Sequence, residues 1–117
     1  MALDTVQNYL DRARALLQDT VEPYRYPSDD LVQALNMAIM ECRRIRPDIM
    51  MDFFATDLPE FSLVELTAAV PIDKQYRTAF VYYITGHAQL RDEEETTDAR
   101  AAAYLGKFIA QLLTTAA

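Results

Sequence analysis

The stretch that most constrains the fold covers residues 26–48, because a helix start, body and end follow one another there. Ser28 is a favourable capping residue, and Asp29 and Asp30 place negative charge where the helix dipole is positive. Pro47 ends the pattern, since proline cannot continue a helix. We therefore predict a helix over residues 28–46. Its apolar residues recur at helical spacing as one inward stripe: Leu31, Leu35, Ala38, Ile39, Cys42 and Ile45.

Three arginines, Arg43, Arg44 and Arg46, crowd the last turn of this predicted helix. Cations are favoured at a helix C-terminus, so stabilisation of the helix end explains them. Contact with a partner explains them equally well. Both interpretations stay open at this point.

Three further stretches have helical periodicity, and we predict helices over residues 4–18, 73–91 and 97–114. Asp4 with Gln7 is the expected capping pair of the first, and Asp73 is the expected cap of the third. The outer face of the third helix is expected to show Lys74, Arg77 and Gln89. The expected inward residues are Leu3, Val6, Tyr9, Leu10, Ala13, Leu16 and Leu17; then Tyr76, Ala79, Phe80, Tyr83, Ile84, His87 and Leu90; then Ala101, Tyr104, Leu105, Phe108, Ile109 and Leu112.

Only two glycines, Gly86 and Gly106, occur in the 117 residues, and both fall within helical patterns. Hairpin turns that need glycine are therefore scarce, which disfavours an all-β fold. The sequence predicts an all-α chain: one domain over residues 1–117, built as a four-helix, bundle-like subunit with a long irregular insertion between its second and third helices.

That insertion, residues 47–72, is the best candidate for an interaction arm, because connections this long are uncommon in a small domain. Packing back onto the helices is the alternative, and the region from Phe61 to Val70 is compatible with one or two short strands, as in a β-hairpin. Together with the three arginines and the C-terminal tail, the candidate partner-binding residues are Met50, Met51, Phe53, Phe54, Leu58, Phe61, Leu63, Leu66, Thr114 and Thr115.

The formal net charge of −7 argues against a protein that grips a phosphate backbone, although it does not exclude proximity to DNA. No apolar run approaches the roughly 20 residues that span a bilayer, and the N-terminus lacks a signal-peptide pattern. We therefore expect a soluble protein without a membrane partner.

Few residues suggest chemistry. Cys42, the only cysteine, and His87, the only histidine, both lie on apolar helical faces, where packing is the expected role. The run Asp92 to Glu95 is expected to be a solvated helix junction, because consecutive carboxylates do not converge on one ion without a suitable loop. The sequence thus predicts no cofactor, no metal site and no enzymatic activity.

Nearly the whole chain resembles the head-to-tail connector, or adaptor, proteins of tailed bacteriophages. The resemblance lies in the order of the following pieces: Val6–Leu17 with Arg12-Ala13, Tyr24-Arg25-Tyr26, Ser28-Asp29-Asp30-Leu31, Leu35-Asn36-Met37-Ala38, Glu41, Arg44, Arg46-Pro47-Asp48, Val70-Pro71-Ile72, Tyr76, Ala79, Asp98-Ala99-Arg100-Ala101 and Phe108.

The resemblance implies a small helical subunit that forms a ring, typically of twelve copies, beneath the portal vertex of the capsid. Such a ring extends the DNA channel and docks tail or nozzle proteins. The expected partners are therefore other copies of the chain, the portal protein, tail proteins and double-stranded DNA that passes without tight binding. The expected location is the virion, with the host cytoplasm during assembly. The alternative is a small regulatory or nucleic-acid-binding helical protein that uses Arg43, Arg44 and Arg46 as phosphate contacts.

Overall fold

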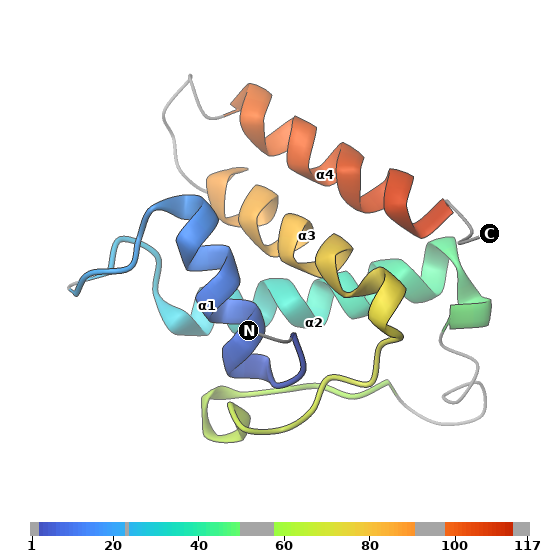
Figure 1. Ribbon diagram of the computed structural model, residues 1–117, viewed down its shortest axis with the longest axis horizontal. Coiled ribbons are helices and arrows are strands. Elements are labelled where there is room, and N and C mark those ends of the chain that lie inside the picture. The colour runs from blue at the N-terminus through green and yellow to red at the C-terminus, as the bar shows by residue number, and fades with distance from the viewer. Residues whose placement is uncertain (1–2, 23, 50–57, 91–97, 114–117) are drawn as a thin grey trace.

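Four α-helices form the body of the molecule in the computed structural model, which confirms the predicted all-α, bundle-like fold (Figure 1). The structure describes residues 3–22, 24–49, 58–90 and 98–113. The helices are α1 (Val6–Leu17), α2 (Ser28–Ile45), α3 (Arg77–Leu90) and α4 (Asp98–Leu113). Short 3-10 segments include η2 (Leu63–Glu65), η3 (Lys74–Tyr76) and residues 47–49. Within these ranges, no helix is both long and apolar enough to cross a membrane.

Helix α3 is the centre of the fold, since it contacts α1, α2 and α4 (Figure 1). The sequence predicted burial of one face, but α3 is buried almost all round. Gln89, predicted to face outward, is buried, and Leu90, predicted to face inward, is half exposed. Thr85 is also buried, and its hydroxyl is satisfied there because it donates a hydrogen bond to the Val81 carbonyl, 2.9 Å away. A helix with three neighbours needs apolar or internally satisfied side chains on every side.

Helices α3 and α4 approach each other closely at Gly86. A Cβ atom there would lie 3.0 Å from the Ala101 carbonyl oxygen and 3.0 Å from Cγ of Leu105, so only glycine fits without a shift. Farther along this interface, the ring of Phe108 meets Phe80 and Tyr83 edge to face, with centroid distances of 5.8 Å and 4.8 Å. This geometry is favourable for aromatic pairs and fixes α4 on α3.

The predicted caps are displaced by one residue or more. Thr5, not Asp4, caps α1: its hydroxyl accepts from the Asn8 backbone N–H, and the Asn8 side chain accepts from the Thr5 N–H. Gln7, the expected partner of Asp4, instead donates to the Asp11 carboxylate. Both pairs, Asp4 with Gln7 and Thr5 with Asn8, have a capping oxygen three residues before a polar side chain. The sequence pattern alone therefore does not show which pair forms the cap.

Ser28 is the first residue of α2 and not its cap, which the structure places at Pro27. The Ser28 hydroxyl instead accepts a hydrogen bond of 2.8 Å from Arg14 of α1. Asp29 and Asp30 do lie in the first turn of α2, as predicted. The third predicted cap, Asp73, precedes η3, and its side chain makes no capping bond; the α-helical part of the 73–91 prediction begins only at Arg77.

Residues 58–72 of the insertion pack on the helices and contain no strand, so the short strands that the sequence allowed for Phe61 to Val70 do not form. A single antiparallel bridge joins Thr5 and Ala69. The carbonyls of Ala68 and Leu66 accept from the N–H groups of Val6 and Gln7, at 3.0 Å and 2.9 Å. These N–H groups belong to the first turn of α1 and have no acceptor within the helix. The segment therefore completes the start of α1.

Candidate interaction site

The end of α2 holds the three arginines that the sequence singled out, and the structure separates their roles. Arg43 is exposed. Arg44 is also exposed, and it pairs with Glu41 one turn earlier, with 2.8 Å between Nη2 and Oε2. An exposed pair of this kind contributes little to stability, on the order of 0–1 kcal/mol.

Arg46 is engaged within the molecule. Its guanidinium forms a two-pronged pair with the Asp48 carboxylate, through Nε at 2.9 Å and Nη2 at 2.7 Å, while Nη1 donates to the Leu112 carbonyl of α4. The hydrogen bonds between these two side chains raise the pKa of Arg46 and lower the pKa of Asp48. The guanidinium also lies 5.9 Å from the Tyr76 ring centroid. Arg46 thus joins the end of α2 to the end of α4.

Asn36 of α2 fixes the insertion at Phe61. The Asn36 amide donates to the Phe61 carbonyl and accepts from the Phe61 N–H, both at 2.9 Å, and the Phe61 side chain is buried. Leu58 and Leu66 pack partly buried against the core. Of the four described candidate residues in the insertion, which are Leu58, Phe61, Leu63 and Leu66, only Leu63 is exposed. Packing onto the helices is thus the interpretation that the structure favours for residues 58–72.

Six other candidate residues of the arm and the tail lie outside the described residues: Met50, Met51, Phe53, Phe54, Thr114 and Thr115.

Exposed apolar side chains occur on three elements, and most of them were not among the candidate residues from the sequence. Met37 and Met40, one turn apart on α2, are 37% and 56% exposed; Val64, next to Leu63 in η2, is 90% exposed. On α4, Ile109 was predicted to face inward but is 44% exposed, and Leu113 one turn later is 58% exposed. The signal for Ile109 was ambiguous because α4 has apolar or small residues on both sides of its stripe.

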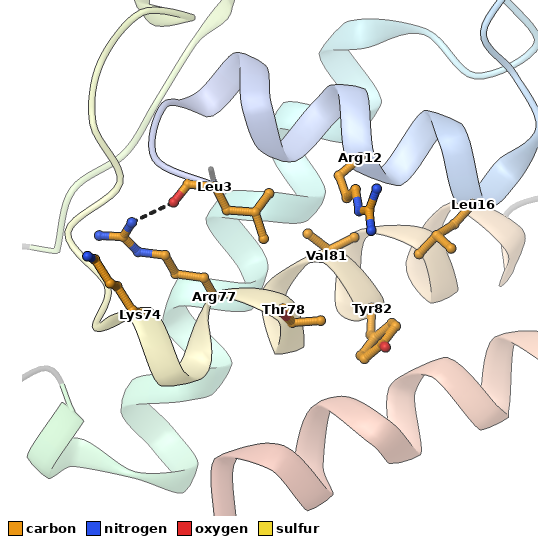
Figure 2. A pocket seen from close by; sticks show the side chains of 8 residues that line it. All are labelled: Leu3, Arg12, Leu16, Lys74, Arg77, Thr78, Val81 and Tyr82. Atoms are coloured by element: carbon orange, nitrogen blue, oxygen red, sulfur yellow. Dashed lines mark hydrogen bonds between the residues drawn. The ribbon is translucent and has the colours of Figure 1, made fainter. Parts of the chain in front are cut away.

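A groove between α1 and the η3–α3 segment has a volume of about 500 Å³. Figure 2 shows Lys74 and Arg77 at one end, Arg12 and Tyr82 farther along on opposite sides, and Leu16 at the other end. Leu3, Leu16 and Val81 supply apolar lining, and Thr78 completes the set. None of these eight residues is acidic, although acidic residues outnumber basic ones in the chain by 18 to 11.

Arg77 is fixed at the groove by the backbone: its Nε donates to the Ile72 carbonyl at 2.8 Å and its Nη1 to the Leu3 carbonyl at 2.6 Å (Figure 2). Arg12 and Lys74 are exposed, and neither pairs with a carboxylate among the described residues. Lys74 and Arg77 were predicted on the outer face of a helix, but no pattern in the sequence relates them to Arg12, 62 and 65 positions earlier.

Metal-ligating side chains do not cluster within the described ranges. No group of three His, Cys, Asp or Glu side chains converges there as a metal site would require. Cys42 is fully buried, as predicted, and burial raises the pKa of its thiol to about 12. His87 is half-buried and stacks on Tyr83 with a centroid distance of 5.9 Å, which agrees with the packing role expected for it.

No protein-family model, no curated protein and no solved structure matches this chain.

Proposed function

We propose that this chain is a structural head-to-tail adaptor of a tailed bacteriophage, a subunit that forms a ring, twelve-membered by analogy with the family, beneath the portal. The observation that carries the proposal is the exposure of apolar pairs on three separate elements: Met37 and Met40, Leu63 and Val64, and Ile109 and Leu113. Contiguous exposed apolar surface on soluble proteins commonly marks contact with other proteins. A ring subunit needs such surfaces on more than one side, because it meets a neighbour on each flank.

The electrostatics are compatible with this role. A chain with a net charge of −7 repels a phosphate backbone on average, so a channel built from it lets DNA pass without holding it. The alternative of a nucleic-acid-binding protein receives less support, since carboxylates already pair with Arg44 and Arg46, two of the three arginines that it requires.

The proposal is tested by mixing the purified chain with portal rings and separating complexes by sedimentation, followed by two-dimensional image averages in the electron microscope. We expect the chain alone to be monomeric or weakly associated and to form a rotationally symmetric ring on the portal. Absence of a co-migrating complex at tens of micromolar would reject the adaptor function.

Lysine substitutions locate the contacts. Met40→Lys, Val64→Lys and Leu113→Lys each introduce a charge on one of the three exposed surfaces, and we expect at least two of them to weaken ring formation strongly. Val21→Lys is the matched control, because Val21 is 80% exposed in the α1–α2 connector and outside the three pairs. If the control lost ring formation to the same extent, or if no variant lost it, the assignment of these surfaces would be contradicted.

A further inference from the structure

The α1–α3 groove described above is a cationic site on an acidic chain. Arg12, Lys74 and Arg77 contribute three of the eleven basic residues to one cavity that has no acidic lining residue. Elsewhere in the described chain, Arg14, Arg44 and Arg46 are paired with carboxylates. Cations that have no carboxylate partner and lie beside apolar walls favour an anionic ligand that also has an apolar group.

We propose that this groove binds the acidic segment that links α3 and α4 in a second copy of the chain. This inference rests on the proposed function and identifies one contact between neighbouring subunits. The segment contains Asp92, Glu93, Glu94 and Glu95, the longest run of carboxylates in the sequence. Leu90, two residues earlier, is 50% exposed and supplies an apolar side chain for the groove.

The distribution of charge in the groove matches this occupant. Lys74 and Arg77 stand together at one end, and Arg12 lies on the other side of Leu3 and Val81 (Figure 2). An apolar side chain followed by several carboxylates meets both kinds of lining when it lies along the groove. Arg77 is already oriented by its two backbone bonds, so a salt bridge to it requires little ordering of the side chain.

The contact is heterologous: the groove of one subunit receives a different surface of its neighbour. Repeated head to tail, such a contact closes into a ring or continues as a filament, depending on the rotation between neighbours. A single self-complementary dimer is not expected from it.

The test uses a fluorescent peptide of residues 89–97 and the full chain, with binding followed by anisotropy. We expect saturable binding that weakens as salt is raised, since exposed charge pairs are screened. The double variant Arg12→Glu/Lys74→Glu should weaken the affinity by about tenfold or more, because like charges then face the peptide. Both residues are exposed and neither holds the fold, so the variant should remain folded.

The matched control is Arg43→Glu/Arg100→Glu, which changes the net charge by the same amount at exposed residues outside the groove. This control should retain the affinity of the parent chain. A peptide with Asp92→Asn and Glu93, Glu94 and Glu95 changed to Gln should bind at least tenfold more weakly.

Three outcomes would overturn the proposal. One is absence of saturable binding, and another is equal weakening by the groove variant and the control, which would indicate non-specific attraction. The third is peptide binding that appears only after the chain's own four carboxylates are neutralised, which would show that the segment occupies its own groove. Each can occur while ring formation on the portal persists, so failure of this contact is distinguishable from failure of the adaptor function.

Discussion

Arg14 and Asp19 form a buried ion pair, with 2.9 Å between Nη1 and Oδ2 and side chains only 5% and 8% exposed. The same guanidinium donates to the Tyr26 carbonyl and the Ser28 hydroxyl, and the carboxylate accepts from the backbone N–H groups of Arg25 and Tyr26. The pair therefore anchors both ends of the connector between α1 and α2, and the Arg14 guanidinium also lies 3.8 Å from the centroid of the Tyr24 ring.

Replacing Asp19 with Asn should destabilise the chain by about 3–5 kcal/mol, because a buried guanidinium then loses its counter-charge. Urea unfolding followed by circular dichroism measures this change. The control is Arg44→Ala, which breaks an exposed pair and should cost less than about 1 kcal/mol. Similar costs for the two variants would show that the Arg14–Asp19 pair is not shielded from water as the structure indicates.

Asn36→Ala should release the insertion from α2. The substitution removes both bonds to Phe61 and leaves a buried N–H and a buried carbonyl without partners, at a cost of about 2–4 kcal/mol. Hydrogen exchange of the Phe61 amide should accelerate more than that of the α3 amides. Gln33→Ala, at an exposed position on the same helix, should leave the exchange unchanged. A uniform acceleration would instead indicate global destabilisation.

The two glycines should respond oppositely to alanine. Gly106→Ala should stabilise by up to about 1 kcal/mol, because nothing lies within 4 Å of the added Cβ and alanine favours the helix. Gly86→Ala should destabilise by about 1–3 kcal/mol, because the Cβ meets a backbone oxygen of α4. Thermal unfolding of both variants tests this contrast, and stabilisation by Gly86→Ala would mean that α4 can move away at little cost.

Stability should fall in alkaline solution through Cys42. Burial raises the pKa of its thiol from 9.0 to about 12, so above pH 9 the unfolded chain releases a proton that the folded chain retains. The buried, protonated thiol makes its full contribution to the free energy of unfolding below pH 9. This contribution is lost between pH 9 and 12, by up to about 1.4 kcal/mol per pH unit. Urea unfolding between pH 8 and 11 measures this slope.

Cys42→Ala is the control for the alkaline experiment. The variant should be about 1 kcal/mol less stable at pH 7, because a small cavity replaces the sulfur, but its stability should fall less steeply above pH 9. Tyr9 titrates in a similar range in both chains, since burial raises its pKa from 10.0 to about 12. Equal slopes for the two chains would show that the thiol does not contribute.

Periodicity and proline predicted the four helices to within a few residues, because amphipathic spacing is set by the helix itself. The predictions that failed have two causes. Gln89 and Leu90 are misplaced because α3 has three helical neighbours, which a stripe read from one helix does not reveal. Thr5 was missed as a cap because Asp4 offers the same chemistry one position earlier.

The sites were less predictable than the helices. The three arginines of α2 were found from the sequence, but the Leu112 carbonyl that accepts from Arg46 lies 66 positions away. The α1–α3 groove likewise combines residues from distant stretches, none of which forms a motif. Local patterns indicate helix ends and faces, whereas such pairings depend on how the helices dock.

The Arg46–Leu112 contact also has a mechanical consequence. It ties the residue that follows α2 to the last turn of α4, 66 positions later in the chain. Fraying of either helix end breaks this bond. The two helix ends are therefore stabilised together.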